Sequence, residues 1–144
     1  MSDIAAQISA LEALTDQQFL DQLADATLDK AHFNHLGHLR AAWLYLREQG
    51  LQQACISYPN SIIKYATTLG APEKFNRTLT NALLRIVHAR QQRNQLESWQ
   101  RFVSLELDLT NDAMGVLALH YSSERLFSAK AMAQIVEPDI SPLP

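Results

Sequence analysis

The sequence feature that most constrains the fold is an amphipathic stretch at residues 33–50, FNHLGHLRAAWLYLREQG. Asn34 suits a helix N-cap, because its side chain can accept a bond from a free backbone N–H in the first turn. Gly50 suits the position just past a helix, because glycine readily takes the left-handed conformation. The stretch therefore predicts a central helix against which the other segments pack.

An apolar face follows this predicted helix when its residues are placed about 100° apart. The members of that face are Leu36, Leu39, Ala42, Trp43 and Leu46. His35 falls inside the face and His38 at its edge, whereas Arg40 points away from it. We therefore expect both imidazoles to lean toward the interior, one helical turn apart.

Two inward histidines at this spacing suggest chemistry. Histidine serves both as an acid/base group and as a metal ligand near neutral pH. His35 and His38 are therefore candidate metal ligands, and His38 is the candidate catalytic base. The structural alternative is a pair of packed histidines, each bonded to a carbonyl or a carboxylate.

The composition favours helices over a sandwich or barrel. The chain has 144 residues, of which 47% are hydrophobic and 19% charged, with four glycines and five prolines. A chain of this length suits one domain with its own core. We expect an all-α, single-domain bundle over residues 1–144, with about six to seven helices and an extended C-terminal tail.

Charge and terminal sequence bear on partners and location. The net charge of −3 shows no basic bias, so nucleic acid is not an expected partner. No apolar run approaches the roughly 20 residues that cross a bilayer, and the N-terminal sequence lacks a signal pattern. Cys55 is the only cysteine, which removes an internal disulfide. These observations favour a soluble protein of the bacterial cytoplasm with no membrane partner.

Other segments carry helix signals of their own. Apolar spacing predicts a helix at residues 3–13, and Thr15 followed by Gln18 is a capping-box pattern for the next one. Pro59 predicts a kink or a break, because proline removes a backbone donor and clashes with the preceding turn. A further helix is expected to start with proline and run over residues 72–94.

Three polar side chains of later segments are candidates for the histidine pocket. Asn76 lies on the apolar face of the helix predicted at residues 72–94, and Thr80 lies at its edge. Glu106 falls within the apolar face of the stretch at residues 96–109, where an unpaired carboxylate is costly. It is a candidate metal ligand, histidine partner or general base. In the alternative, Asn76 caps its helix, and Glu106 reaches water where its helix ends early.

Three motifs resemble those of an uncharacterised family of small bacterial helical proteins. They are FNHLGHLRAAWLYL, KFNRTLT and HYSSERLFSAKA…VEPD, which resemble FxHxxHxRxAW, (Y/F)HxTxT and YYSxExLxS…PD over roughly residues 30–140. The resemblance marks His35, His38, Asn76, Thr78, Thr80 and Tyr121. Asn76 stands where the family pattern has histidine. If that histidine is a metal ligand, the resemblance implies weak or lost metal binding in this chain.

The first functional hypothesis is a histidine-based or metal-dependent enzyme. His35 and His38 would be ligands or an acid/base pair, with Glu106 as a third group. Two histidines and a carboxylate suit a divalent metal such as iron or zinc. A metal-free form would use His38 as base, with Thr80 or Tyr121 orienting a polar substrate.

Two further hypotheses need no catalysis. In one, the chain binds a small molecule in a pocket with His35, Asn76, Thr80 and Tyr121 as ligand-binding residues. In the other, it is a protein-interaction module or a homodimer. Leu44 and Leu84 lie off the main faces of their predicted helices and would then form an exposed apolar patch.

Overall fold

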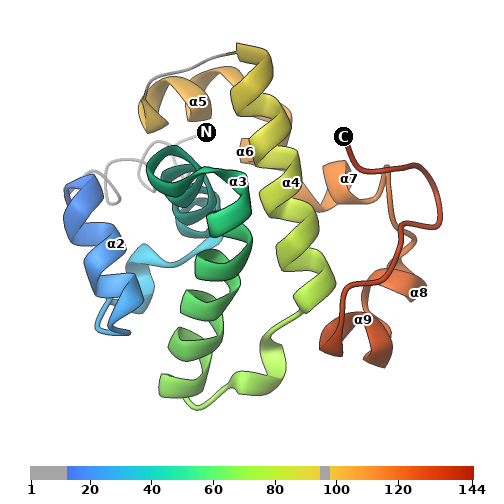
Figure 1. Ribbon diagram of the computed structural model, residues 1–144, viewed down its shortest axis with the longest axis horizontal. Coiled ribbons are helices and arrows are strands. Elements are labelled where there is room, and N and C mark those ends of the chain that lie inside the picture. Colours follow the sequence, from blue (N-terminus) through green and yellow to red (C-terminus); the bar gives the residue numbers. More distant parts are fainter. Residues whose placement is uncertain (1–12, 95–97) are drawn as a thin grey trace. The chain divides into compact units, whose positions relative to one another are not determined.

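The computed structural model describes residues 13–94 and 98–144, and Figure 1 shows helices joined by short connections. These ranges contain eight α-helices, close to the number predicted, and no strand. The all-α class is therefore confirmed, whereas the helix predicted at residues 3–13 falls almost wholly outside the described residues. The chain divides into two compact units, unit 1 (Met1–Pro72) and unit 2 (Glu73–Pro144). The single domain over residues 1–144 stays a prediction.

Helix α2 (Asp16–Ala24) opens the described part of unit 1 and begins at the predicted capping box. The Thr15 side chain accepts a bond from the backbone N–H of Gln18, and the Gln18 side chain accepts one from the backbone N–H of Thr15. The buried residues of α2 are Phe19, Leu20 and Leu23. A short 3-10 turn, η1 (Lys30–His32), then leads into the next helix.

Helix α3 (His35–Thr68) is the central element of unit 1. It begins where predicted, because the Asn34 side chain accepts a bond from the backbone N–H of Gly37 at 3.0 Å. Its backbone leaves the helical region at Gly50, with φ of 80° and ψ of 169°. The two halves of α3 consequently run in different directions (Figure 1). Glycine takes this positive φ at little steric cost, which explains why the bend falls at this residue.

The two halves of α3 are joined by hydroxyl groups. The Tyr45 and Ser61 oxygens lie 2.6 Å apart, and the Tyr58 hydroxyl donates to the carbonyl of His38 at 3.1 Å. Pro59 keeps helical backbone angles. The predicted break at this residue is therefore wrong, whereas the alternative of a kink without a break stays a prediction.

The predicted apolar face of α3 is confirmed. Its buried members are Leu36, Leu39, Ala42, Trp43 and Leu46. The expectation that Arg40 points away is wrong, since its residue is only 1% exposed. Helix α2 supplies the reason: the Arg40 guanidinium bonds to Asp16 Oδ1 and to the carbonyl of Leu14, each at 2.9 Å. It also lies 4.8 Å from the centre of the Phe19 ring.

Helix α4 (Arg77–Asn94) is the longest helix of unit 2. It follows a single 3-10 turn, η2 (Pro72–Lys74), so the predicted helical start at Pro72 is a turn instead. The buried residues of α4 are Thr78, Thr80, Ala82, Leu83, Leu84, Ile86 and Val87. The predicted exposed patch around Leu44 and Leu84 is wrong, because both side chains are buried in the described structure.

Five short helices complete unit 2. They are α5 (Trp99–Leu105), α6 (Leu107–Asn111), α7 (Ala113–Leu117), α8 (Ser123–Leu126) and α9 (Ala129–Ala133). The helix predicted over residues 96–109 is interrupted at Glu106, whose φ of −94° and ψ of 62° are not helical. Ser122 and Ser128 cap α8 and α9 through side-chain oxygens.

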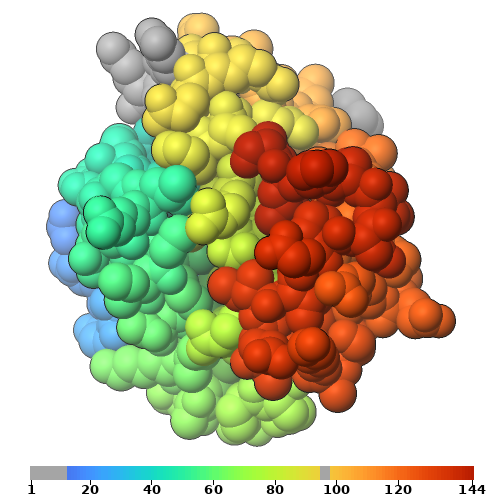
Figure 2. Space-filling model, turned by 45° about the vertical axis from the view of Figure 1, so that its right-hand side comes forward, coloured from blue at the N-terminus to red at the C-terminus, as the bar shows by residue number. Residues whose placement is uncertain are grey.

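The final residues, 135–144, contain no helix and form an extended segment that we call the strap. Figure 2 shows the strap, in dark red, on the surface of unit 2 against α4. The predicted extended tail is therefore confirmed. None of the described helices is both long enough and apolar enough to cross a membrane.

Candidate functional site

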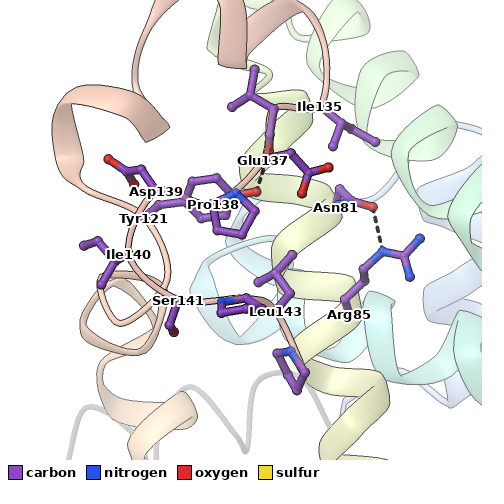
Figure 3. A pocket seen from close by; sticks show the side chains of 13 residues that line it. Asn81, Arg85, Tyr121, Ile135, Glu137, Pro138, Asp139, Ile140, Ser141 and Leu143 are labelled. Carbon is purple, nitrogen blue, oxygen red and sulfur yellow. Dashed lines mark hydrogen bonds between the residues drawn. The ribbon is translucent and has the colours of Figure 1, made fainter.

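Unit 2 contains a cavity of about 570 Å³ between the strap and α4. Tyr121 and the α4 residues Asn81 and Arg85 line it together with the strap, as Figure 3 shows. Small-molecule sites usually have volumes of about 300–1,000 Å³. We call this space the strap cavity and regard it as the candidate binding site.

The strap is fixed at its start by bonds on both sides of Val136. The backbone N–H of Val136 donates to the Thr78 hydroxyl oxygen at 3.1 Å, and its carbonyl accepts from the Tyr121 hydroxyl at 2.6 Å. The Thr78 hydroxyl in turn donates to the carbonyl of Gln134 at 2.8 Å. One threonine of α4 therefore holds two consecutive stretches of backbone leading into the strap.

The middle of the strap is held by the start of α8. Both carboxylate oxygens of Asp139 accept bonds from Ser122, one from its hydroxyl at 2.6 Å and one from its backbone N–H at 2.8 Å. These bonds lower the pKa of the Asp139 carboxyl below its ordinary value of 3.8. Arg125 adds a bond from Nε to the carbonyl of Glu137 at 2.5 Å.

The last part of the strap is held by the residues just before α8. The backbone N–H of Ile140 donates to the carbonyl of His120 at 3.0 Å. The His120 Nδ1 lies 2.9 Å from the carbonyl of Pro142, so Nδ1 carries the proton, because a carbonyl only accepts. The Ser141 hydroxyl donates to the carbonyl of Leu119 at 3.0 Å. Bonds thus hold the strap along its length, and it forms a fixed cavity wall.

Opposite charges occur on the rim of the cavity. Arg85 Nε donates to Asn81 Oδ1 at 3.3 Å, and Glu137 points toward the side where these two residues lie (Figure 3). Tyr121 also lines the cavity, and its hydroxyl bonds to the carbonyl of Val136. Burial raises its pKa above the ordinary value of 10.0, and the charge of Glu137 raises it further. Tyr121 is therefore a neutral donor at physiological pH.

The His38 imidazole in unit 1 is held on its own helix. The Phe33 ring stacks on it with 4.0 Å between centroids, and Nδ1 lies 2.9 Å from the Asn34 carbonyl. Burial lowers its pKa below the ordinary value of 6.5; the bond to Asn34 opposes this, and the charge of His35 adds to it. The ring is consequently neutral near pH 7, with the proton on Nδ1 and a lone pair on Nε2.

His35 does not lie in the apolar interior as predicted, because its side chain is exposed. It is the first residue of α3, and no earlier helical turn extends the apolar face past it. Within residues 13–94 and 98–144, no three His, Cys, Asp or Glu side chains are grouped closely enough to hold a metal ion. The metal site at His35 and His38 stays a prediction.

Asn76 caps its helix, as the structural alternative proposed. Its side-chain oxygen accepts a bond from the backbone N–H of Leu79 at 3.0 Å, and its amide nitrogen donates to the carbonyl of Leu126 at 2.9 Å. The buried Asn76 therefore ties the start of α4 to the end of α8.

Glu106 neither reaches water nor stands unpaired. It is 4% exposed, and its Oε1 lies 2.7 Å from Arg90 and 3.0 Å from Arg93. Its second oxygen accepts a bond from Asn94. Arg90 is shared with Asp108, at 2.8 Å. The expectation that its helix ends early is correct, but the expectation that the carboxylate then meets water is wrong.

Asn76 and Glu106 occupy opposite ends of α4. Asn76 bonds to its first turn and Glu106 to Arg90 and Asn94 near its end. At about 1.5 Å of rise per residue, these ends lie about 20 Å apart. The prediction that the two side chains share one pocket is therefore wrong. His35 and His38 belong to unit 1, and their pairing with residues of unit 2 stays a prediction.

One of the four predicted ligand-binding residues, Tyr121, lines the strap cavity, whereas Thr80 is a buried residue of α4. Sequence reasoning missed Asn81, Arg85 and Glu137. The first two lie on the polar side of an amphipathic helix, where most residues only meet water. The available signal was the set of apolar residues around VEPD, Ile135, Val136, Ile140 and Leu143, because a solvated tail is usually poor in such residues.

Searches of protein-family models, curated proteins and solved structures found no match to this chain. The resemblance of the three motifs to a bacterial family stays a prediction. Function is therefore inferred from the geometry within each unit.

Proposed function

We propose that this protein binds a small organic molecule in the strap cavity without transforming it. The observation that supports this most strongly is the fixed wall. Residues 135–144 have no helix, yet hydrogen bonds hold them along their length while they enclose about 570 Å³ beside α4. Ligand sites are usually preformed in this way, because ordering a wall on binding would lower affinity.

The groups around the cavity suit binding. Tyr121, Val136 and Leu143 supply apolar surface, and Asn81 and Arg85 supply donors at the rim. Such a combination of an apolar surface with few polar groups fixes both the position and the orientation of a ligand. The Asp139 carboxylate has both oxygens bonded to Ser122, and its role is therefore to hold the wall.

The proposal is tested by two-dimensional NMR of the full chain during titration with small amphipathic metabolites. We expect a binding compound to shift the signals of Tyr121, Ile140 and Leu143, with Leu23 of unit 1 as the internal control. A ligand at 100 times its Kd should also stabilise the fold by about 2.7 kcal/mol. The proposal is wrong if a broad compound set leaves the strap signals unchanged.

Histidine chemistry in unit 1 is the second candidate. The observation that favours it is the bond from His38 Nδ1 to the Asn34 carbonyl, since such a bond orients a histidine and leaves Nε2 for a proton or for iron or zinc. Elemental analysis of the purified chain and of His38→Gln tests the metal form. Stoichiometric metal in the native chain that is lost in the variant would support it, and its absence from the native chain would exclude it.

A further inference from the structure

Besides Asp139, whose two carboxylate oxygens are bonded to Ser122, two opposite charges line the strap cavity without pairing with each other. Arg85 and Glu137 both border the strap cavity, and no ion pair in the described ranges, 13–94 and 98–144, involves either one. Both side chains are exposed, and an exposed ion pair is worth only about 0–1 kcal/mol, so nothing forces the two charges to pair. Here the two charges are kept separate and remain available to a third group.

Asn81 holds the positive charge in place. Its side-chain oxygen accepts the bond from Arg85 Nε, which leaves both terminal nitrogens of the guanidinium unused by Asn81. Those two nitrogens present parallel N–H groups that match the two oxygens of a carboxylate. The position of Arg85 on α4, one turn after Asn81, therefore leaves two parallel donors that a carboxylate can bind.

The strap holds the negative charge in place. Arg125 donates to the backbone carbonyl of Glu137, and the neighbouring Val136 is bonded through both its N–H and its carbonyl. With its backbone fixed on both sides, the Glu137 carboxylate extends from a rigid base toward the side of Asn81 and Arg85 (Figure 3). A carboxylate in this position favours an ammonium group.

Apart from Asp139 and Ser141, whose side chains are bonded to the protein, most of the remaining lining is apolar. Tyr121, Ile140 and Leu143 border it away from the two charges. Three prolines of the strap, at positions 138, 142 and 144, add ring carbons and remove backbone donors. This surface accepts a hydrocarbon or aromatic body and offers few donors to a second anionic group.

We infer that the strap cavity takes a small zwitterion with an apolar body, such as a free amino acid with a branched or aromatic side chain or a dipeptide of such residues. The inference rests on the proposed function and names the ligand class for that site. Arg85 binds the carboxylate, Glu137 binds the ammonium, and the side chain lies against Tyr121 and Leu143. A purely anionic ligand would leave Glu137 repelling it, and a purely cationic ligand would leave Arg85 doing so.

The test compares four ligands that share one carbon skeleton. They are leucine, 4-methylpentanoate without the amine, 3-methylbutylamine without the carboxylate, and the neutral 4-methylpentan-1-ol. Calorimetry gives each Kd, and NMR reports the Tyr121 signal for the full chain at pH 7. We expect leucine to bind at least about tenfold more tightly than each of the other three, because charge-assisted bonds are the stronger ones.

Two variants assign the charges. In Arg85→Gln, leucine should lose its advantage over 3-methylbutylamine, and in Glu137→Gln it should lose its advantage over 4-methylpentanoate. Arg77→Gln on α4 and Glu124→Gln on α8 remove the same charges outside the cavity lining. These two controls should bind leucine with unchanged Kd. If only the two cavity variants change the ligand preference, the cause is direct recognition of each charge and not the change in the net charge of the protein.

Other results overturn the inference in distinguishable ways. If the alcohol or a singly charged analogue shifts the Tyr121 signal and binds with the same Kd as leucine, the preference for a zwitterion is wrong. The proposal that the cavity binds a small molecule is then unaffected. If Arg85→Gln and Glu137→Gln both leave the leucine Kd within about twofold, the assignment of charges is wrong. If no member of the series shifts Tyr121, and dipeptides of leucine and phenylalanine also fail, the ligand class fails. The proposed function fails as well only if the broader compound set gives no shift.

Discussion

Unit 1 buries a cation and unit 2 buries an anion. Arg40 is 1% exposed and meets Asp16, whose side chain is 34% exposed. Glu106 is 4% exposed and meets Arg90 and Arg93. In both units the buried charge lies at a junction and the partner lies nearer to water. A buried charge is costly unless paired, so each unit uses one to fix a neighbouring segment.

The units differ in what their other buried polar groups hold. In unit 1, Tyr45, Ser61 and Tyr58 bond between the two halves of one helix. In unit 2, Thr78 and Tyr121 bond to a segment without secondary structure. Unit 1 also has a cavity, of about 550 Å³, but helices α2 and α3 line it, whereas the strap cavity of about 570 Å³ has a wall of irregular backbone that hydrogen bonds hold in place. This difference explains why the candidate site belongs to the strap.

The largest expected effect comes from removing the buried cation. Arg40→Ala leaves the carbonyl of Leu14 without this donor and opens a gap beside Phe19, while Asp16 keeps its second partner, Arg47, at 3.4 Å. The lost packing of this long buried side chain and the lost hydrogen bond to a backbone carbonyl should together cost about 2–5 kcal/mol in unfolding free energy. Chemical denaturation should show this loss, with Arg101→Ala on the surface as control. A loss below about 1 kcal/mol would show that the charge is not needed for the fold.

A smaller loss should follow removal of the buried anion. In Glu106→Ala, Arg90 still pairs with Asp108 at 2.8 Å, and Arg93 is mostly exposed, so neither cation is stranded. We expect a cost of about 1–3 kcal/mol in unfolding free energy, because lost charged hydrogen bonds are partly replaced by water. A cost that equals or exceeds that of Arg40→Ala would remove the distinction between the units.

The two units should also respond differently to mild acid. The pKa of His38 is lowered in the folded state, so between that value and the ordinary 6.5 the unfolded chain binds more protons. The stabilisation from neutral His38 is fully present above pH 6.5 and is lost as the pH falls toward the lowered pKa of the folded state. The free energy of unfolding then decreases by at most about 1.4 kcal/mol per pH unit. Denaturation at stepped pH measures it.

His38→Gln should flatten that slope, because it removes the titrating ring. The native chain, measured at the same pH steps, is the reference for this slope. Equal slopes in the native chain and in His38→Gln would mean that His38 is not the group responsible.

The smallest effect concerns the strap. Tyr121→Phe keeps the ring and removes the donor to the Val136 carbonyl. We expect a loss of about 1 kcal/mol and faster hydrogen exchange at Ile140, because the strap loses one of its anchors. Ser104→Ala removes a hydroxyl on α5 and should leave the strap unchanged. Exchange at Ile140 that matches the native rate would show that the remaining bonds suffice.

Local signals were readable from the sequence. The capping box at Thr15 and Gln18, the cap at Asn34 and the interruption at Gly50 depend on residues a few positions apart, whose geometry any helix shares. The apolar face of α3 followed from its period. The all-α class therefore needed no knowledge of tertiary contacts.

Tertiary packing decided the rest. Arg40 is buried because Asp16 of α2, 24 residues earlier, pairs with it. A helical wheel drawn for one helix cannot show such a partner from another helix. Thr78 bonds to Val136 across 58 residues, so the sequence of neither segment alone predicts the cavity between them. The predicted burial of His35 is wrong for the same reason, because only the segments that pack on a helix decide which of its side chains are covered.

The bend in α3 has a stereochemical consequence. A Cβ built at Gly50 meets nothing within 4 Å, so space is not what excludes a side chain there. The backbone geometry excludes it instead, because a φ of 80° with a ψ of 169° is a region that essentially only glycine adopts. Gly50→Ala should therefore cost about 1–3 kcal/mol in unfolding free energy, although its methyl group meets no atom.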